Sequence, residues 1–217
     1  MTPKSISEKI DAERYGIEEF IRFTSKKLSS GSILLDAGAG RCPYKVFFSK
    51  LTYIAVDLKG QVELDVIASI DSLPFRNNCI DAILCTQVLE HVKDPKKVLF
   101  EFHRVLSAEG DLFMTVPQGW GLHDKPHDYF RFTSYALQFL FKATGFDIVF
   151  IKPRGGYFWY IGNRLRLFPS FIRNKFLRFI SSYLFGVIIP LICFYLDVLD
   201  QDKDWTLGYA CFCRKVT

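Results

Sequence analysis

The sequence predicts an α/β fold built around a parallel sheet. Four short apolar runs occur before residue 117, and helix-like patterns lie between some of them. The first run ends in an acid that two glycines follow in step, in ILLDAGAGRCPYKV, residues 33–46. Glycines after a strand are typical of nucleotide-cofactor loops, because they let the backbone approach a ligand closely. Strands that alternate with helices favour a parallel sheet with crossover helices.

The N-terminal region is expected to form a helix over 6–28. Ser5 and Glu8 form a capping box. Apolar residues recur behind it at roughly helical spacing, namely Ile10, Ile17, Phe20, Ile21 and Leu28. The first 30 residues are charged throughout and lack an apolar core, so we expect no secretory signal.

The apolar runs predict the strands that follow. They cover 33–35, 53–56, 80–85 and 112–116, with two late strands at 146–151 and 206–212. Helical patterns cover 94–107 and 130–144, and a further helix is expected directly after the glycine loop. No linker divides the chain, so we expect one domain over 1–217.

Composition and charge limit the class of protein. Apolar residues make up 49% and charged residues 24%, as in globular proteins. Six cysteines without CxxC or zinc-type spacing predict buried thiols in a reducing compartment, and hence a cytoplasmic location. The stretch 148–196 holds 13 of the 35 aromatics and no acidic residue. Its seven basic residues are Lys152, Arg154, Arg164, Arg166, Arg173, Lys175 and Arg178. This block indicates an anionic surface as partner.

Two acids and two glycines predict a nucleoside site. Asp36, Gly38 and Gly40 lie at the end of the first strand, and Asp57 ends the second. A carboxylate there can accept both hydroxyls of an adenosine ribose. An NAD loop would read G-x-G-x-x-G, but Pro43 stands at the third position, which disfavours an NAD oxidoreductase. The two glycines alone are equally compatible with a structural tight turn.

Residues 33–116 resemble the class I S-adenosylmethionine-dependent methyltransferases, especially the broad type 11 family. Five blocks carry the resemblance in order: LLDAGAG, YIAVDL, SIDSLPF, DAILCTQVLEHVKDP and EFHRVLSAEGDLFMTVP. The later HDKPHDYFRFT, LFKATGF and DKDWTLGYACFCRK resemble a bacterial subgroup. The resemblance implies a Rossmann-like methyltransferase fold with a mostly parallel seven-stranded sheet and helices on both faces. It also implies methyltransferase activity with S-adenosyl-L-methionine as cofactor.

The resemblance further implies which residues bind the cofactor. Asp36, Gly38 and Gly40 would line its methionine end. Asp57 would hold the ribose, with Leu58 against the adenine. The remaining contacts would come from Ser69, Ile70 and Asp71 at the adenine edge, Gln87 at the methionine moiety, and His91 packing beside the cofactor.

Three departures from the family's pattern motivate an alternative. Cys42 stands where many members have a third glycine, and Ser69 where many have an acid that meets the adenine amino group. SAEGD replaces the usual Lys-Pro-Gly-Gly. The departures at Cys42 and Ser69 motivate a non-catalytic S-adenosylmethionine-binding partner protein as an alternative, and a methyltransferase remains the favoured prediction.

The segment GWGLHDKPHDYFRFT, residues 119–133, holds the candidate catalytic residues, because in this fold it overhangs the cofactor's methyl group. Three interpretations compete. The favoured one is a packed lid that orients the substrate through Asp128, Tyr129 and Arg131, with Asp128 and Arg131 paired. The second makes His127 or His123 a general base. The least favoured is a metal held by both histidines and Asp128, so we expect no metal.

An apolar, basic insertion over 155–205 separates the last two strands. It contains an uncharged run of 18 residues, Phe179–Leu196. A single membrane crossing would leave 205–217 unable to rejoin the sheet. A cap helix or dimer face and an in-plane element on the inner face of the membrane remain equally favoured. The uncharged run disfavours nucleic acid as partner, so an RNA methyltransferase is only an alternative. We expect methyl transfer to a small or lipid-linked acceptor at oxygen, and make no prediction of oligomeric state.

Overall fold

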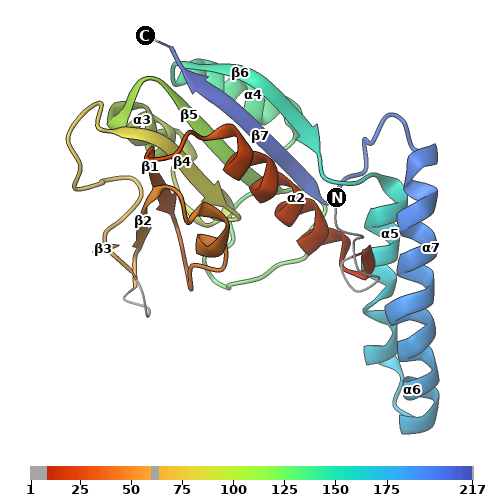
Figure 1. Cartoon of the computed structure of the whole chain (residues 1–217). Coiled ribbons are helices and arrows are strands. Elements are labelled where there is room, and N and C mark those ends of the chain that lie inside the picture. Colours follow the sequence, from red (N-terminus) through yellow and green to blue (C-terminus); the bar gives the residue numbers. More distant parts are fainter. Residues whose placement is uncertain (1–8, 60–63, 217) are drawn as a thin grey trace. The chain divides into compact units, whose positions relative to one another are not determined.

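The computed structural model describes residues 9–59 and 64–216 (Figure 1). The expected capping box at Ser5 and Glu8 lies outside the described residues. Helix α2 spans Ala12–Lys27 and is interrupted from residues 9–10 at Asp11. The carboxylate of Asp11 accepts a hydrogen bond from the Arg14 N–H (3.2 Å). An Asp side chain in this position caps a helix, so α2 begins later than the apolar spacing predicts.

Seven strands of the described chain form one sheet, in the order β3-β2-β1-β4-β5-β7-β6. Their bounds are Ile33–Ala37 (β1), Thr52–Asp57 (β2), Val66–Ile67 (β3), Ile80–Thr86 (β4), Leu106–Pro117 (β5), Phe146–Pro153 (β6) and Gly208–Lys215 (β7). The pairs β1–β2, β1–β4, β2–β3 and β4–β5 are parallel. The predicted parallel sheet is therefore confirmed, with β3 as a strand that the sequence did not indicate.

The strand order predicts a ligand crevice at the carboxyl ends of the central strands. Strands β2 and β3 follow β1 on one side of it, whereas β4 pairs with the other side of β1. The carboxyl ends of β1, β2 and β4 therefore meet where the order reverses. Open α/β sheets bind ligands in the crevice at such a reversal.

Helices cover both faces of the sheet, as predicted (Figure 1). Side chains alternate along β5, so Phe113 lies on one face and Met114 on the other. Phe113 packs against Phe20 of α2 and stacks on Phe212 of β7, with ring centroids 4.7 Å apart. Met114 belongs to the core on the opposite face, together with Phe102 of helix α3 (Pro95–Val105) and residues of helix α4 (Ser134–Ala143).

Two predicted helices differ from the structure in physically explicable ways. Helix α4 begins at Ser134 rather than at residue 130, because the Thr133 hydroxyl accepts from the Ala136 N–H and caps the helix. After the glycine loop, only the 3₁₀ turn η1 (Lys45–Phe48) forms, so the expected helix there is wrong. Tyr44 offers this turn no side-chain cap, and β2 already begins at Thr52.

The chain divides into two compact units. One comprises 20–152 and 209–217, and the other comprises 1–19 and 153–208. The second unit contains the expected insertion, which forms helices α5 (Tyr157–Leu165), α6 (Lys175–Tyr183) and α7 (Ile189–Leu196). Shorter turns complete it: η3 (Phe168–Phe171), η5 (Asp197–Leu199) and the π-helical η4 (Leu184–Ile188) between α6 and α7. The single domain over 1–217 stays a prediction, because compactness alone does not decide whether the two units fold together.

Candidate functional site

Asp36 lies near the end of β1 and is buried. The Tyr53 hydroxyl of β2 donates a hydrogen bond to its Oδ2. Burial raises the pKa of Asp36 to about 6; the hydrogen bond from Tyr53 lowers it, and the negative charge of Asp57 adds to the rise. A nearby cation would therefore be needed to stabilise the ionised form.

Asp57 closes the glycine loop from the end of β2. Its Oδ2 accepts from the Gly40 N–H (2.9 Å), and its Oδ1 accepts from the Leu58 N–H (2.6 Å). These bonds fix the plane of the carboxylate across the loop. A carboxylate oxygen can accept more than one hydrogen bond, so Asp57 retains acceptor capacity for a ligand hydroxyl.

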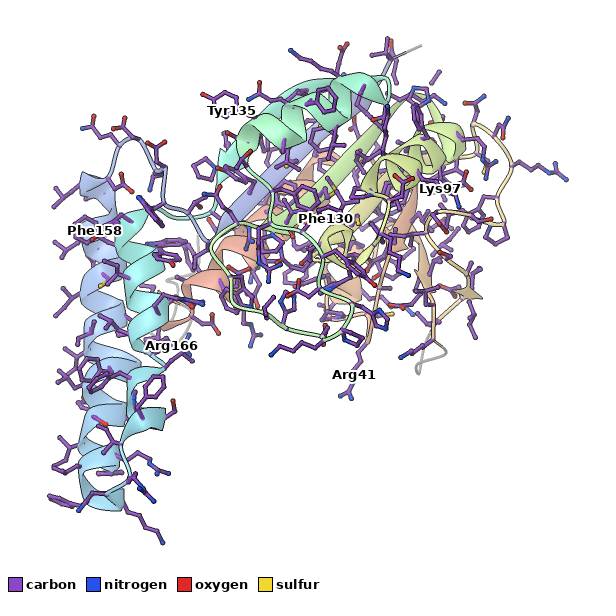
Figure 2. The ribbon with its side chains drawn as sticks, turned by 180° about the vertical axis from the view of Figure 1, so that it is seen from behind. Arg41, Lys97, Phe130, Tyr135, Phe158 and Arg166 are labelled. Carbon is purple, nitrogen blue, oxygen red and sulfur yellow. The ribbon has the colours of Figure 1, made fainter. Side chains whose placement is uncertain are left out.

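The two glycines of the loop face different surroundings. A Cβ on Gly38 would lie 2.4 Å from Cγ2 of Val88, so only glycine permits the loop to pack against the segment after β4. A Cβ on Gly40 would meet nothing within 4 Å. The side chain of Arg41, the next residue, is exposed (Figure 2). Gly38 therefore has a packing role, whereas the loop at Gly40 borders open space.

The predicted adenine-edge residues come from one short loop. The Ser69 hydroxyl donates to Asp71 Oδ1 (2.5 Å), and Lys97 of α3 donates to Asp71 Oδ2 (3.0 Å; Lys97 is labelled in Figure 2). The Ser69 hydroxyl and then Lys97 lower the pKa of Asp71. Ile70 is buried, whereas Leu58 is 65% exposed. Asp71 thus holds the loop in shape, and Leu58 offers an apolar surface.

Gln87 follows β4 and is fixed by β5. Its backbone has a φ of 54°, its N–H donates to the Thr115 carbonyl (2.9 Å), and its side-chain Nε2 donates to Thr115 Oγ1 (3.0 Å). The left-handed backbone turns this residue out of the strand direction at the carboxyl edge of the sheet. Thr115 was not singled out in the sequence, because nothing local marks it as a partner of Gln87.

Asp128 and Arg131 form the pair that the lid interpretation expects, within the loop 118–133 that joins β5 to α4. Two parallel hydrogen bonds of 2.7 Å join the guanidinium to the two carboxylate oxygens. Arg131 also donates to the carbonyl oxygens of Trp120 (3.0 Å) and Gly121 (2.8 Å). The hydrogen bonds from Arg131 to the carboxylate, with one from the His123 N–H (2.9 Å), lower the pKa of the buried Asp128 carboxylate far below its usual value. The geometry favours a structural role for the pair.

Two histidines converge on a buried acid. His91 Nδ1 lies 2.7 Å from the His127 carbonyl oxygen, and His123 Nδ1 lies 3.2 Å from the Gly121 carbonyl oxygen. Because a carbonyl only accepts, each ring donates from Nδ1, which leaves the lone pair of the neutral ring on Nε2. Each Nε2 lies 3.9 Å from Oε1 of Glu90, which is buried. Glu90 was missed in the sequence because its burial leaves no local signal.

The metal site considered for His123, His127 and Asp128 is not assembled among the described residues. Both carboxylate oxygens of Asp128 accept hydrogen bonds from Arg131. His127 Nδ1 lies 3.1 Å from the Tyr129 hydroxyl. The side chains that do converge are Glu90, His91 and His123, whose ligand atoms lie within 4.8 Å of one another. The same spacing suits a carboxylate shared by two imidazoles, so it assigns no metal.

The central part of the chain matches a known protein family. Residues 35–114 match the family described as "Methyltransferase domain". This range contains Asp36, both loop glycines, Asp57 and Gln87. A curated relative, "Uncharacterized protein MJ0638" of Methanocaldococcus jannaschii, is 26% identical over 167 residues, which cover 73% of this chain and 71% of the relative.

Solved structures share the fold. The 1,6-didemethyltoxoflavin-N1-methyltransferase of Burkholderia thailandensis, solved with S-adenosylhomocysteine, has a TM-score of 0.61 at 17% identity. The match covers 94% of this chain and 80% of that one. The [4+2]-cyclase SpnF has a TM-score of 0.61 at 18% identity, over 92% of this chain and 81% of that one. At such identities the likeness concerns the fold alone, which does not fix the reaction.

Proposed function

We propose that this chain is an S-adenosylmethionine-dependent methyltransferase that methylates an oxygen of a small or lipid-linked acceptor, since residues 35–114 match the methyltransferase-domain family. The observation that carries the proposal is the placement of Asp36 and Asp57. Their carboxylates lie near the carboxyl ends of adjacent parallel strands, and Asp57 bonds to the glycine loop that follows Asp36.

The residues present fit S-adenosylmethionine. Asp57 is oriented by two backbone amides and can accept from ribose hydroxyls. Gly40 borders open space, and Leu58 offers an exposed apolar side chain to a purine. Asp36 is a buried carboxylate whose ionised form gains from a cation, which the methionine amino group supplies. Bound there, the cofactor supplies a methyl group activated by a sulfonium.

The chain's own contribution to methyl transfer is alignment and proton removal. The nucleophile must be held in line with the methyl group, which the loop 118–133 can do as a rigid platform. A hydroxyl acceptor must also lose its proton, which a neutral imidazole can take at Nε2.

His123 is the favoured base among the two predicted histidines. Its Nδ1 lies 3.2 Å from the Gly121 carbonyl and 3.4 Å from Asp128 Oδ2, so two acceptors hold the ring with its lone pair on Nε2. A base oriented by a carboxylate behind it is the arrangement that general-base catalysis requires. His127 is exposed, and its Nδ1 meets only a tyrosine hydroxyl in the described contacts.

A second candidate function is a non-catalytic or non-methylating protein on the same fold. The likeness of this fold to that of the [4+2]-cyclase SpnF supports this candidate, since a methyltransferase-like fold can host other chemistry. The departures at Cys42 and Ser69 point the same way.

A transfer assay with methyl-labelled S-adenosylmethionine tests the proposal. Lipid, glycan and RNA fractions of the source cell serve as acceptors, and label is expected in the lipid or glycan fraction. His123→Asn should lower turnover by about 10²–10⁴-fold while leaving cofactor affinity nearly unchanged. His127→Asn is the matched control and should lose far less.

The outcomes separate the candidates. Label in the RNA fraction alone would replace the proposal with an RNA methyltransferase. Cofactor binding without label in any fraction would favour the non-catalytic protein. Full turnover in the His123 variant, with a loss in the His127 variant, would reverse the assignment of the base.

A further inference from the structure

The insertion folds into a helical hairpin, which we call the apolar hairpin and define as residues 157–199. Helix α5 forms one arm, and the continuous α6–η4–α7 segment forms the other (Figure 1). The two arms pack closely, since a Cβ on Gly162 would lie 2.8 Å from Cβ of Cys193 and 3.4 Å from Cα of Pro190. Asp197 closes the base by accepting hydrogen bonds from the N–H groups of Gly156 and Trp159 at the start of α5 (both 3.0 Å).

The longer arm has the burial pattern of a protein in lipid rather than in water. The buried positions on this arm are small or polar, namely Ser181, Pro190, Cys193 and Asp197. Large apolar side chains are exposed instead, among them Phe176 (71%), Phe179 (76%), Ile180, Tyr183, Ile188 and Ile192. Only 17% of the most apolar window within Lys175–Leu199 is buried. A core helix of a soluble protein buries its large apolar residues, whereas helices in membranes pack through small ones.

The end of the hairpin where the arms join is cationic. Arg173, Lys175 and Arg178 are exposed, and no acidic residue occurs between Ile148 and Leu196. Phe176 and Phe179 lie beside these cations in α6 and are exposed as well, and Lys175 and Phe179, four residues apart, share one face of the helix. Long basic side chains can extend their charges to lipid headgroups while apolar neighbours enter the acyl chains.

The topology excludes a single membrane crossing. The chain leaves the sheet at the end of β6 and returns in β7, and these two strands are neighbours. Both ends of the hairpin are therefore on the same side of any bilayer. The arm of α5 continues through Arg164 and Arg166 (Phe158 and Arg166 are labelled in Figure 2), which disfavours a second span.

We propose that the apolar hairpin docks this protein on an anionic lipid bilayer, lying in the interface without crossing it. The cations select the anionic surface, and the exposed aromatic and aliphatic side chains enter the acyl region. The inference concerns the second unit and holds whether or not the first unit transfers methyl groups.

Vesicle flotation of the full chain tests the proposal. Vesicles contain either phosphatidylcholine alone or phosphatidylcholine with phosphatidylglycerol, at low salt and at about 1 M salt. We expect flotation with the anionic vesicles at low salt. High salt should weaken flotation without abolishing it, because the Debye length falls to about 3 Å while the apolar contacts remain.

Two variants with matched controls separate the charge from the apolar contribution. Changing Arg173, Lys175 and Arg178 to Ser should weaken binding to anionic vesicles by about fivefold per cation, or on the order of 100-fold in all. The control changes Lys50, Lys93 and Lys142, three exposed lysines of the other unit, to Ser. Phe176→Ser with Phe179→Ser should remove the flotation that survives high salt. Its control is Tyr135→Ser with Phe139→Ser, two exposed aromatics of α4.

The flotation results distinguish membrane docking from the alternatives. Circular dichroism of each variant confirms that it is folded before it is scored. If the intact chain stays unbound with anionic vesicles at low salt, or if the control variants lose as much as the hairpin variants, the proposal is overturned. A concentration-dependent dimer of the unbound chain, abolished by the Phe176 and Phe179 changes, would assign the hairpin to self-association instead.

Discussion

At the scale of single residues, Asp36 shows how a buried carboxylate costs stability. Its pKa is raised from 3.8 to about 6, with burial as the main cause. A group whose folded pKa is raised stabilises the fold fully only below its unfolded pKa. That contribution is lost as pH rises through about 6, so at pH 7 the ionised carboxylate opposes folding.

Replacing Asp36 by Asn should therefore have opposite effects on stability and on binding. Asn keeps an acceptor for the Tyr53 hydroxyl but removes the buried charge. We expect the free energy of unfolding of the ligand-free protein to rise at pH 7 by about 1–3 kcal/mol, and by less at pH 5. Denaturant unfolding at the two pH values measures the change.

The affinity for S-adenosylhomocysteine should depend on pH in the same range. Only the ionised Asp36 attracts the ligand's amino group, and its ionised fraction rises about tenfold between pH 5 and pH 7 when the pKa is about 6. Calorimetry should show an affinity gain of that order in the native protein and none in Asp36→Asn. A native affinity that is flat from pH 5 to 7 would contradict this account of the residue.

The sequence located this residue but not its environment. Asp36 and Asp57 were found because they end apolar runs beside glycines. Tyr53 and Thr115 were not found, because their contacts join segments far apart in the chain. Glu90 was not found, because its burial leaves no local signal. A hydrogen bond across strands leaves no local pattern.

At the scale of elements, the loop 118–133 owes its shape to one ion pair. The Asp128 carboxylate is buried, and Arg131 also donates hydrogen bonds to three carbonyl oxygens of the loop. Lysine retains the charge but cannot reproduce the parallel hydrogen bonds of a guanidinium.

Arg131→Lys should consequently lower the free energy of unfolding by about 2–4 kcal/mol, since it leaves a buried charge imperfectly paired. Limited proteolysis should show earlier cleavage in this loop. Arg76→Lys, at an exposed arginine, serves as the control and should stay within about 0.5 kcal/mol of the native protein. An Arg131 variant as stable as the control would mean that the pair does not hold the loop.

Element boundaries were predictable only where a local signal sets them. The apolar runs located six of the strands, but β3 has only two residues, too few for a periodic pattern. The helix expected after the glycine loop failed because tertiary constraints left room for one turn between Pro43 and Thr52. The late start of α4 follows from the cap at Thr133, which the apolar spacing does not register.

At the scale of the whole molecule, the chain combines a sheet of the nucleotide-binding α/β type with an inserted helical hairpin. The sequence predicted the place, charge and apolar character of the insertion. It did not predict that two arms would bury small residues and close through Asp197, because that closure depends on contacts between separate helices. We propose that the unit formed by 20–152 and 209–217 holds S-adenosylmethionine through Asp57 and the glycine loop.

Isothermal titration calorimetry of the native chain and of Asp57→Ala, with S-adenosylhomocysteine and NAD as ligands, tests that claim most directly. The account predicts that S-adenosylhomocysteine binds and NAD does not. Asp57→Ala should weaken binding by about 1–3 kcal/mol, the worth of charge-assisted hydrogen bonds to the ribose. Asp147→Ala, at an exposed acid of β6, should leave binding unchanged. Equal affinity in the native and Asp57→Ala proteins, or tighter binding of NAD, would contradict it.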